Sequence, residues 1–94
     1  MRVRWLRTAL ANLEAEAEYI ARDNPAAASR VVATIVRSVE RLAKYPASGR
    51  PGRVAGTREL VVAGTPYIIP YRIRGGAVEV LRVFHGARRW PPKF

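Results

Sequence analysis

The sequence predicts an α+β fold with the order β-α-α-β-β-β, in which an N-terminal helical hairpin packs on one face of a small antiparallel sheet. Residues 9–22 and 25–45 repeat apolar side chains three and four positions apart, the spacing of one helical face. Residues 58–85 contain three short runs rich in Val, Ile, Tyr and Phe, separated by turn signals, which is typical of a three-strand antiparallel meander. A sheet with one apolar face needs a cover, and we expect the helices to supply it.

The length of 94 residues predicts one domain that spans the chain. Within residues 1–94 we expect a strand and helical hairpin over 1–45 and a basic loop over 46–57. The β-meander follows over 58–86, and the C-terminal tail over 87–94 is expected to be loosely held.

The N-terminal half reads as one strand followed by two helices. Residues 2–5 alternate arginine with apolar residues, so Val3 and Trp5 are predicted to face the core. Thr8 is predicted to cap the first helix. Asn24 and Pro25 then end that helix and begin the next, because proline disfavours helical geometry before it and is tolerated at a first helical position. The very short link predicts an antiparallel helical hairpin.

The meander contains one strong turn signal and one conflict. Gly75 and Gly76 separate two apolar runs, as in a two-residue hairpin turn whose central residues need positive φ. Pro70 lies inside a predicted strand where it cannot donate a hydrogen bond, so we expect a bulge or an unpartnered position there. On the last strand, strict alternation would place Leu81 and Val83 against the helices.

Charge is the most informative property of the composition. Seventeen basic residues against seven acidic ones give a formal net charge of +10, and 15 of the basic residues are arginine. Such a domain is expected to bind an anionic partner, either nucleic acid or an acidic protein. The alternative interpretation is a genome that favours arginine codons.

The composition also limits the chemistry. The chain has no cysteine and one histidine, so we expect no disulfide, no metal site and no cofactor. No apolar run is long enough to span a bilayer, and the N-terminus lacks the apolar core of a signal peptide. A cytoplasmic location without a membrane partner is expected.

One set of residues could act on a phosphodiester. Histidine is the usual acid or base near neutral pH, and His85 lies at a strand end beside Arg88 and Arg89. With Arg72, these arginines could hold a phosphate and stabilise charge in a transition state. A single histidine without a carboxylate partner is also typical of a structural residue.

A second set could form a binding surface. Arginines from adjacent strands could line up across the sheet, and arginines before the meander could close around them. The alternative for residues 46–57 is a plain connector. Aromatic residues could add stacking faces, although Tyr67 and Tyr71 also fit core positions. The candidate binding residues are Arg50, Arg53, Arg58, Arg72, Arg74, Arg82 and Trp90.

Four segments carry a resemblance that covers nearly the whole chain. They are Gly49-Arg-Pro-Gly-Arg53, Gly56-Thr-Arg-Glu-Leu-Val-Val62, Pro70-Tyr-Arg-Ile73 and Val80-Leu-Arg-Val-Phe-His-Gly-Ala-Arg-Arg-Trp-Pro91. With Asn24-Pro25-Ala26-Ala27, they resemble toxins of the RelE/ParE superfamily from bacterial type II toxin–antitoxin modules. The resemblance implies the fold described above.

The resemblance implies two possible targets. RelE-like members cleave messenger RNA on the ribosome and use an arginine in a strand that resembles Tyr67–Tyr71, where this chain has Ile68. They also use a C-terminal arginine, which Arg88 or Arg89 would match, and often a following tyrosine, where this chain has Trp90. ParE-like members inhibit DNA gyrase without a nuclease site.

The ParE-like alternative is slightly favoured, because Pro70-Tyr71-Arg72 and the segment from Leu81 to His85 resemble that branch. Whether the chain is an enzyme stays open at this point. A small RNA-binding module without toxicity is a third and more distant alternative.

A toxin of either branch implies an antitoxin that neutralises its arrest of growth. The charge of +10 predicts an acidic partner segment that is disordered alone and folds on this protein. We expect a toxin–antitoxin hetero-oligomer, with gyrase or the ribosome and its message as the cellular target. No small-molecule substrate is expected.

Overall fold

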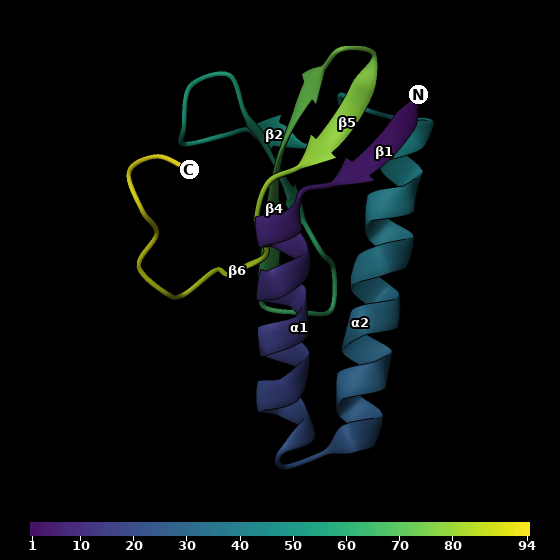
Figure 1. The fold of residues 1–94 in the computed structure, drawn as a ribbon, viewed down its shortest axis with the longest axis vertical. Helices are drawn as coiled ribbons and strands as arrows, with labels where there is room; N and C mark the ends of the chain where they lie inside the picture. Colours follow the sequence, from purple (N-terminus) through teal and green to yellow (C-terminus); the bar gives the residue numbers. More distant parts are fainter.

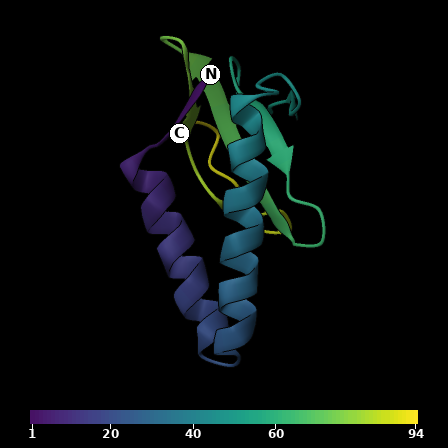
Figure 2. The ribbon, with the colours of Figure 1, turned by 90° about the vertical axis from the view of Figure 1, so that its right-hand side faces the viewer.

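A computed structural model describes residues 1–94 and shows two helices beside a six-stranded sheet (Figure 1). The elements in chain order are β1 (Arg2–Trp5), α1 (Arg7–Ala21), α2 (Pro25–Glu40), the 3-10 turn η1 (Arg41–Ala43), β2 (Arg50–Pro51), β3 (Arg58–Val61), β4 (Tyr67–Arg74), β5 (Ala77–Val80) and β6 (Phe84–His85). Both ribbon views show the α1–α2 turn extending beyond the sheet (Figures 1 and 2). No helix has the length and apolar character that crossing a membrane would require.

The first helix begins earlier than the sequence indicated. The predicted cap, Thr8, lies inside α1, and the residue before the helix is Leu6, which offers no side-chain cap. The backbone N–H of Leu6 donates to the carbonyl of Val80 at 3.0 Å. The chain is therefore still tied to the sheet at Leu6 and can begin the helix at the next residue.

The second helix begins as predicted. The side chain of Asn24 accepts a hydrogen bond from the N–H of Ala27 at 3.0 Å, and Pro25 occupies the first helical position. The α-helix ends at Glu40 rather than at the predicted residue 45, and the chain tightens into the 3-10 turn. Such a turn at a helix end satisfies backbone groups that the last α-helical turn leaves free.

The sheet is mixed, which corrects the expectation of a purely antiparallel sheet. Its strand order is β1-β5-β4-β3-β2, with β6 paired to β4. The strands from β2 to β6 pair antiparallel, but β1 runs parallel to β5. The chain leaves β1 through a helical hairpin instead of a tight turn. Strand β1 is therefore free to pair with a distant strand, and parallel pairing needs such a long connection.

The turn between β4 and β5 is formed by Gly75 and Gly76, with φ of 59° and 72°, as the two-glycine signal predicted. The ladder is interrupted further along. Val80 pairs with Tyr71 and Phe84 pairs with Ile68, so three residues of one strand oppose two of the other. The irregularity expected near Pro70 thus lies on its partner strand, as a bulge over residues 81–83.

The bulge changes which residues of the last strand face the helices. Val78 and Val80 lie in the core, so the prediction that the side carrying Leu81 faces the helices is wrong. Val83 does lie in the core, because the extra residue reverses the alternation before β6.

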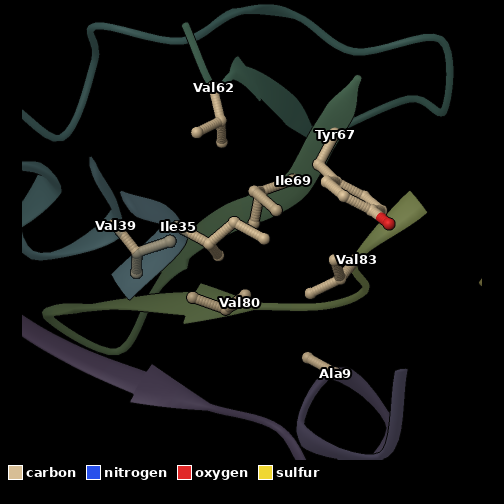
Figure 3. Close-up of a cluster of buried hydrophobic side chains, with 8 residues drawn as sticks. All are labelled: Ala9, Ile35, Val39, Val62, Tyr67, Ile69, Val80 and Val83. Atoms are coloured by element: carbon tan, nitrogen blue, oxygen red, sulfur yellow. The ribbon is translucent and has the colours of Figure 1, made fainter. Parts of the chain in front are cut away.

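The core lies between the hairpin and the sheet. Ile35 and Val39, one helical turn apart on α2, are fully buried with Ile69 and Val80 of the sheet (Figure 3). Ala9 of α1 faces the same cluster (Figure 3). Each buried aliphatic side chain of this size contributes about 1.5–3 kcal/mol relative to an exposed one. The helices therefore cover one sheet face and leave the opposite, outer face for polar side chains.

Candidate functional site

The outer face carries a row of charged residues across three strands. Arg4 of β1 and Arg72 of β4 both lie opposite Glu79 of β5 in the sheet register. Nε of Arg72 donates to Oε1 of Glu79 at 2.7 Å, and Nη1 of Arg4 lies 3.4 Å from Oε2. The hydrogen bond from Arg72, together with the charges of Arg72, Arg4 and Arg74, holds the pKa of Glu79 below its ordinary value of 4.5.

A second carboxylate organises the loop before β3. Glu59 is 3% exposed and accepts hydrogen bonds from the Nε and Nη2 atoms of Arg50 at 3.1 and 2.9 Å. It also accepts from the backbone N–H and Nε of Arg53 at 2.9 and 3.0 Å. Burial raises the pKa of Glu59, but these hydrogen bonds outweigh burial and leave the pKa below 4.5. Residues 50–53 of the predicted basic loop are therefore bound to the sheet through Glu59.

Arg58 lies on the helix-covered face and not with the other candidate arginines. It pairs with Tyr71 in the register, and directly paired residues share a face. Its Nη1 donates to the carbonyls of Ala47 and Gly49 at 3.3 and 2.8 Å. The Tyr71 hydroxyl accepts from the N–H of Gly49 at 2.8 Å and donates to the carbonyl of Pro46 at 2.7 Å. Arg58 thus fixes the connection after α2.

His85 also lies on the helix-covered side. It pairs with Tyr67, whose ring it meets edge-on at 5.8 Å between centroids. Its Nδ1 accepts a hydrogen bond from the N–H of Ala87 at 3.2 Å. The bulge over residues 81–83 places His85 on the helix-covered side, because without the extra residue His85 would point to the outer face.

The C-terminal tail is fixed to α1, which corrects the expectation of a loosely held end. Nη1 of Arg88 donates to Glu16 at 2.7 Å, and the hydroxyl of Tyr67 donates to the other oxygen of Glu16 at 2.9 Å. Burial and the bond to Glu16 raise the pKa of Tyr67 to about 12, and the same carboxylate raises the pKa of Arg88. Arg89 is exposed beside this contact.

An aromatic cluster covers the outer face where β4 meets β6. Phe84 lies opposite Ile68 in the register and packs against Trp90 and Phe94, with ring centroids 4.7 and 5.8 Å away. The guanidinium of Arg53 lies 3.6 Å from the centroid of Trp90. The position where RelE-like toxins have a strand arginine, Ile68, therefore lies beside Phe84 of this cluster.

A cleft of about 400 Å³ opens beside this cluster, between the loop before β3 and the end of the tail. Arg72, Arg82 and Lys93 line it together with apolar side chains that include Leu81 and Phe94. A separate groove of about 690 Å³ runs along α1 and α2 and is lined by small residues such as Ala17, Ala28 and Val32. The molecule thus has one cationic cleft and one apolar groove.

The structure brings most of the candidate binding residues to the outer face and separates the candidate catalytic ones. The residues on the outer face are Arg50, Arg53, Arg72, Arg74, Arg82 and Trp90. Arg58 and His85 lie on the helix side, and Arg88 is bound to α1. Arg72 therefore does not share a site with His85 and Arg88.

Sequence reasoning missed the three glutamates that position these arginines and also missed Arg4. Glu59 stood out in the sequence only as a single acid near basic residues, and Glu79 as one polar position in an apolar strand. The signal that could have found these glutamates is a single acid within a strand of mostly apolar residues. Burying an unpaired carboxylate is costly, so such an acid is expected to have a basic partner. Arg4 could have been placed opposite Glu79 only if the parallel pairing of β1 with β5 had been known. Tyr67 and Tyr71 are core residues, with 3% and 0% exposure.

The whole domain matches known toxins. Residues 3–90 match the sequence model of a family described as ParE toxin of type II toxin–antitoxin system, parDE. The chain belongs to the ParE toxin family. It is 56% identical over 90 residues to a protein named "Putative toxin Y4kP" of Sinorhizobium fredii, which covers 96% of this chain and 93% of the relative. It is 40% identical over 84 residues to Toxin RelE2 of Caulobacter vibrioides, covering 89% and 93%.

A solved structure agrees with this assignment. The chain superposes on a chain of the chromosomal ParDE TA system from P. aeruginosa with a TM-score of 0.81 and 32% identity, covering 90% of this chain and 95% of the other. This ParE-family protein is therefore the toxin component of a type II toxin–antitoxin system.

Proposed function

We propose that this ParE-family toxin arrests growth by inhibiting DNA gyrase and does not cut nucleic acid. The observation that carries the proposal is the separation of the acid–base candidate from the arginines. His85 packs against Tyr67 on the helix side, whereas Arg72 and Arg82 line a cleft on the outer face. General acid–base chemistry needs the proton-transferring group within hydrogen-bond reach of the reacting atom, and this arrangement supports binding over cleavage.

The aromatic cluster supports the same conclusion. Ile68 and Trp90 replace the arginine and tyrosine that the RelE-like branch uses, and Phe84 packs between their positions. Apolar rings there provide contact area for a protein target but no charge for a transition state. The second candidate function is ribosome-dependent cleavage of messenger RNA. It is retained because the Caulobacter relative is named Toxin RelE2.

We infer that the neutralising partner is an acidic antitoxin that forms a hetero-oligomer with this chain. A net charge of +10 favours an acidic segment, and the groove between α1 and α2 has the small apolar lining that accepts a helix. Two observations support this inference: the basic charge of this chain is complementary to an acidic partner, and the chain matches a structure of a ParDE system.

The deciding experiment compares two reconstituted reactions. Gyrase supercoiling and formation of the cleavage complex are measured with increasing toxin, and message integrity is measured in a translation extract with and without ribosomes. We expect loss of supercoiling and intact message. Unaffected gyrase together with ribosome-dependent cutting would overturn the proposal in favour of the RelE-like alternative.

A further inference from the structure

Four arginines form a rectangle on the outer face of the sheet. The register places Arg4 and Arg72 on either side of Glu79, and Arg2 and Arg74 on either side of Ala77. Residues two apart on a strand are about 6.6 Å apart, and strands separated by one neighbour are about 9.5 Å apart. We call Arg2, Arg4, Arg72 and Arg74 the arginine rectangle.

The rectangle holds more positive charge than its own acid can neutralise. Glu79 is the one acid between its members and binds Arg72 and Arg4. Arg2 and Arg74 are exposed, and Ala77 occupies the position between them. Four arginines less one glutamate leave a local charge of +3. By contrast, Arg50 and Arg53 share the carboxylate of Glu59.

The rectangle continues into the cationic cleft through Arg72, which belongs to both. The cleft adds Arg82 and Lys93, and its apolar wall includes the ring of Phe94. Its volume of about 400 Å³ lies within the roughly 300–1,000 Å³ of small-molecule sites. An array of cations beside an aromatic-walled cleft suits a polymer with repeated anions and flat apolar groups.

We propose that this face binds a single strand of DNA, with consecutive phosphates on the arginine rectangle and one unpaired base in the cleft against Phe94. Guanidinium groups match phosphate oxygens in pairs, and stacking on an aromatic ring accepts any base. A duplex would keep its bases paired and leave the cleft unused. The choice of DNA over RNA rests on the proposed action on gyrase, whose substrate is DNA.

The test measures binding without gyrase, so that the two proposals can fail separately. Fluorescence anisotropy follows a labelled oligothymidylate titrated with the purified toxin. The double variant Arg2→Glu/Arg74→Glu changes the rectangle. The variant Arg22→Glu/Arg30→Glu changes charge near the turn of the helical hairpin, because Arg22 directly follows α1 and Arg30 lies in the second turn of α2. Two reversals lower the net charge by four in each case, from +10 to +6.

We expect the rectangle variant to bind at least tenfold more weakly than the wild type and the hairpin variant to stay within about twofold. Contacts to three or four phosphates give a slope of about −2 to −3 for log affinity against log salt. Equal losses in the two variants would show a response to total charge alone and overturn the inference. Circular dichroism verifies that both variants are folded.

A second variant tests the base in the cleft. Phe94→Ala should weaken binding to the single strand about fivefold to tenfold and leave duplex binding unchanged. Tighter binding to a duplex or to an RNA of the same length would overturn the assignment to single-stranded DNA. If the rectangle variant loses antitoxin affinity and keeps oligonucleotide affinity, the face is a protein interface instead. If the wild type inhibits gyrase but does not bind the oligothymidylate, this inference fails and the proposed function stands.

Discussion

Arg53 joins a buried carboxylate to the C-terminal tail. Its guanidinium carbon lies 3.6 Å from the centroid of Trp90, while its Nε donates to Glu59 at 3.0 Å. One side chain therefore links the strand β3 to a segment that follows it by about thirty residues in the sequence. The position of the tail depends on this link, on the contact between Arg88 and Glu16 at its beginning, and on the packing of its aromatic rings against Phe84.

Arg53→Ala should release the tail. The contact between an arginine and an exposed aromatic ring contributes about 0.5–1 kcal/mol, so the open form should become several-fold more populated. Limited trypsin digestion after Arg89 measures this population and should run about threefold to fivefold faster than in the wild type. Arg30→Ala on α2 is the matched control. An unchanged rate at Arg89 would show that the tail is held elsewhere.

Glu59→Gln should lower the free energy of unfolding by about 1–2 kcal/mol at pH 7, because charge-assisted hydrogen bonds to two half-exposed arginines are lost. The folded pKa of Glu59 is below its ordinary value, so its contribution is fully present above pH 4.5 and is lost as pH falls through the lowered pKa. Urea unfolding at several pH values tests this. The difference between wild type and variant should shrink below about pH 4.5, and a difference that grows on acidification would refute the assignment.

Tyr71→Phe should destabilise the protein by about 1–3 kcal/mol, since the Gly49 N–H and the Pro46 carbonyl would lose their partner in the interior. Tyr45→Phe provides the control, because Tyr45 is 58% exposed. Chemical unfolding of both variants measures the effect. Comparable stabilities would mean that water replaces the hydroxyl without cost.

His85→Ala should leave growth arrest intact under the proposed function. The imidazole supports the tail through Ala87 and packs against Tyr67, so a modest loss of stability of about 1 kcal/mol is expected. Growth after induction is compared with that of wild type and of an empty vector. If the His85→Ala variant is folded but no longer arrests growth, and the wild type cuts message, the results would favour the RelE-like alternative.

Antitoxin affinity should decrease as salt is added, because attraction between an acidic segment and a surface with net charge +10 is screened. Titration calorimetry between about 50 and 500 mM NaCl covers screening lengths from above to below 10 Å. A flat response would assign the affinity to apolar packing alone.

A separate pair of variants tests packing in the helical groove. Ser29→Arg places a long side chain in the groove and should weaken antitoxin binding. Ala26→Arg adds the same charge outside the groove lining and is the control.

The parts of the fold that depend on neighbouring residues could be predicted from the sequence. Asn24 and Pro25 begin α2, and Gly75 and Gly76 form a hairpin, because each signal acts within a few residues. The helical faces followed from periodicity. The RelE/ParE resemblance, carried by short segments, predicted the family that the comparisons confirm.

The remaining features depend on pairing between distant residues. The bulge beside Pro70 sets the face of His85, and alternation alone cannot locate an extra residue. The pairing of Arg88 with Glu16 joins residues 72 positions apart. Sequence reasoning therefore listed candidate arginines, but it could not divide them between the two faces of the sheet.

The parallel partnership of β1 with β5 has a consequence for synthesis on the ribosome. Arg2 pairs with Ala77, a separation of 75 residues (77 − 2), and β1 has no other strand beside it. The first strand must wait, unpaired, until nearly all of the polypeptide has been translated. Contacts of such long range also slow the closing step of folding. The charged surface that β1 and β5 share, with Arg4 and Glu79, is therefore completed only when the ribosome has nearly reached the end of the message.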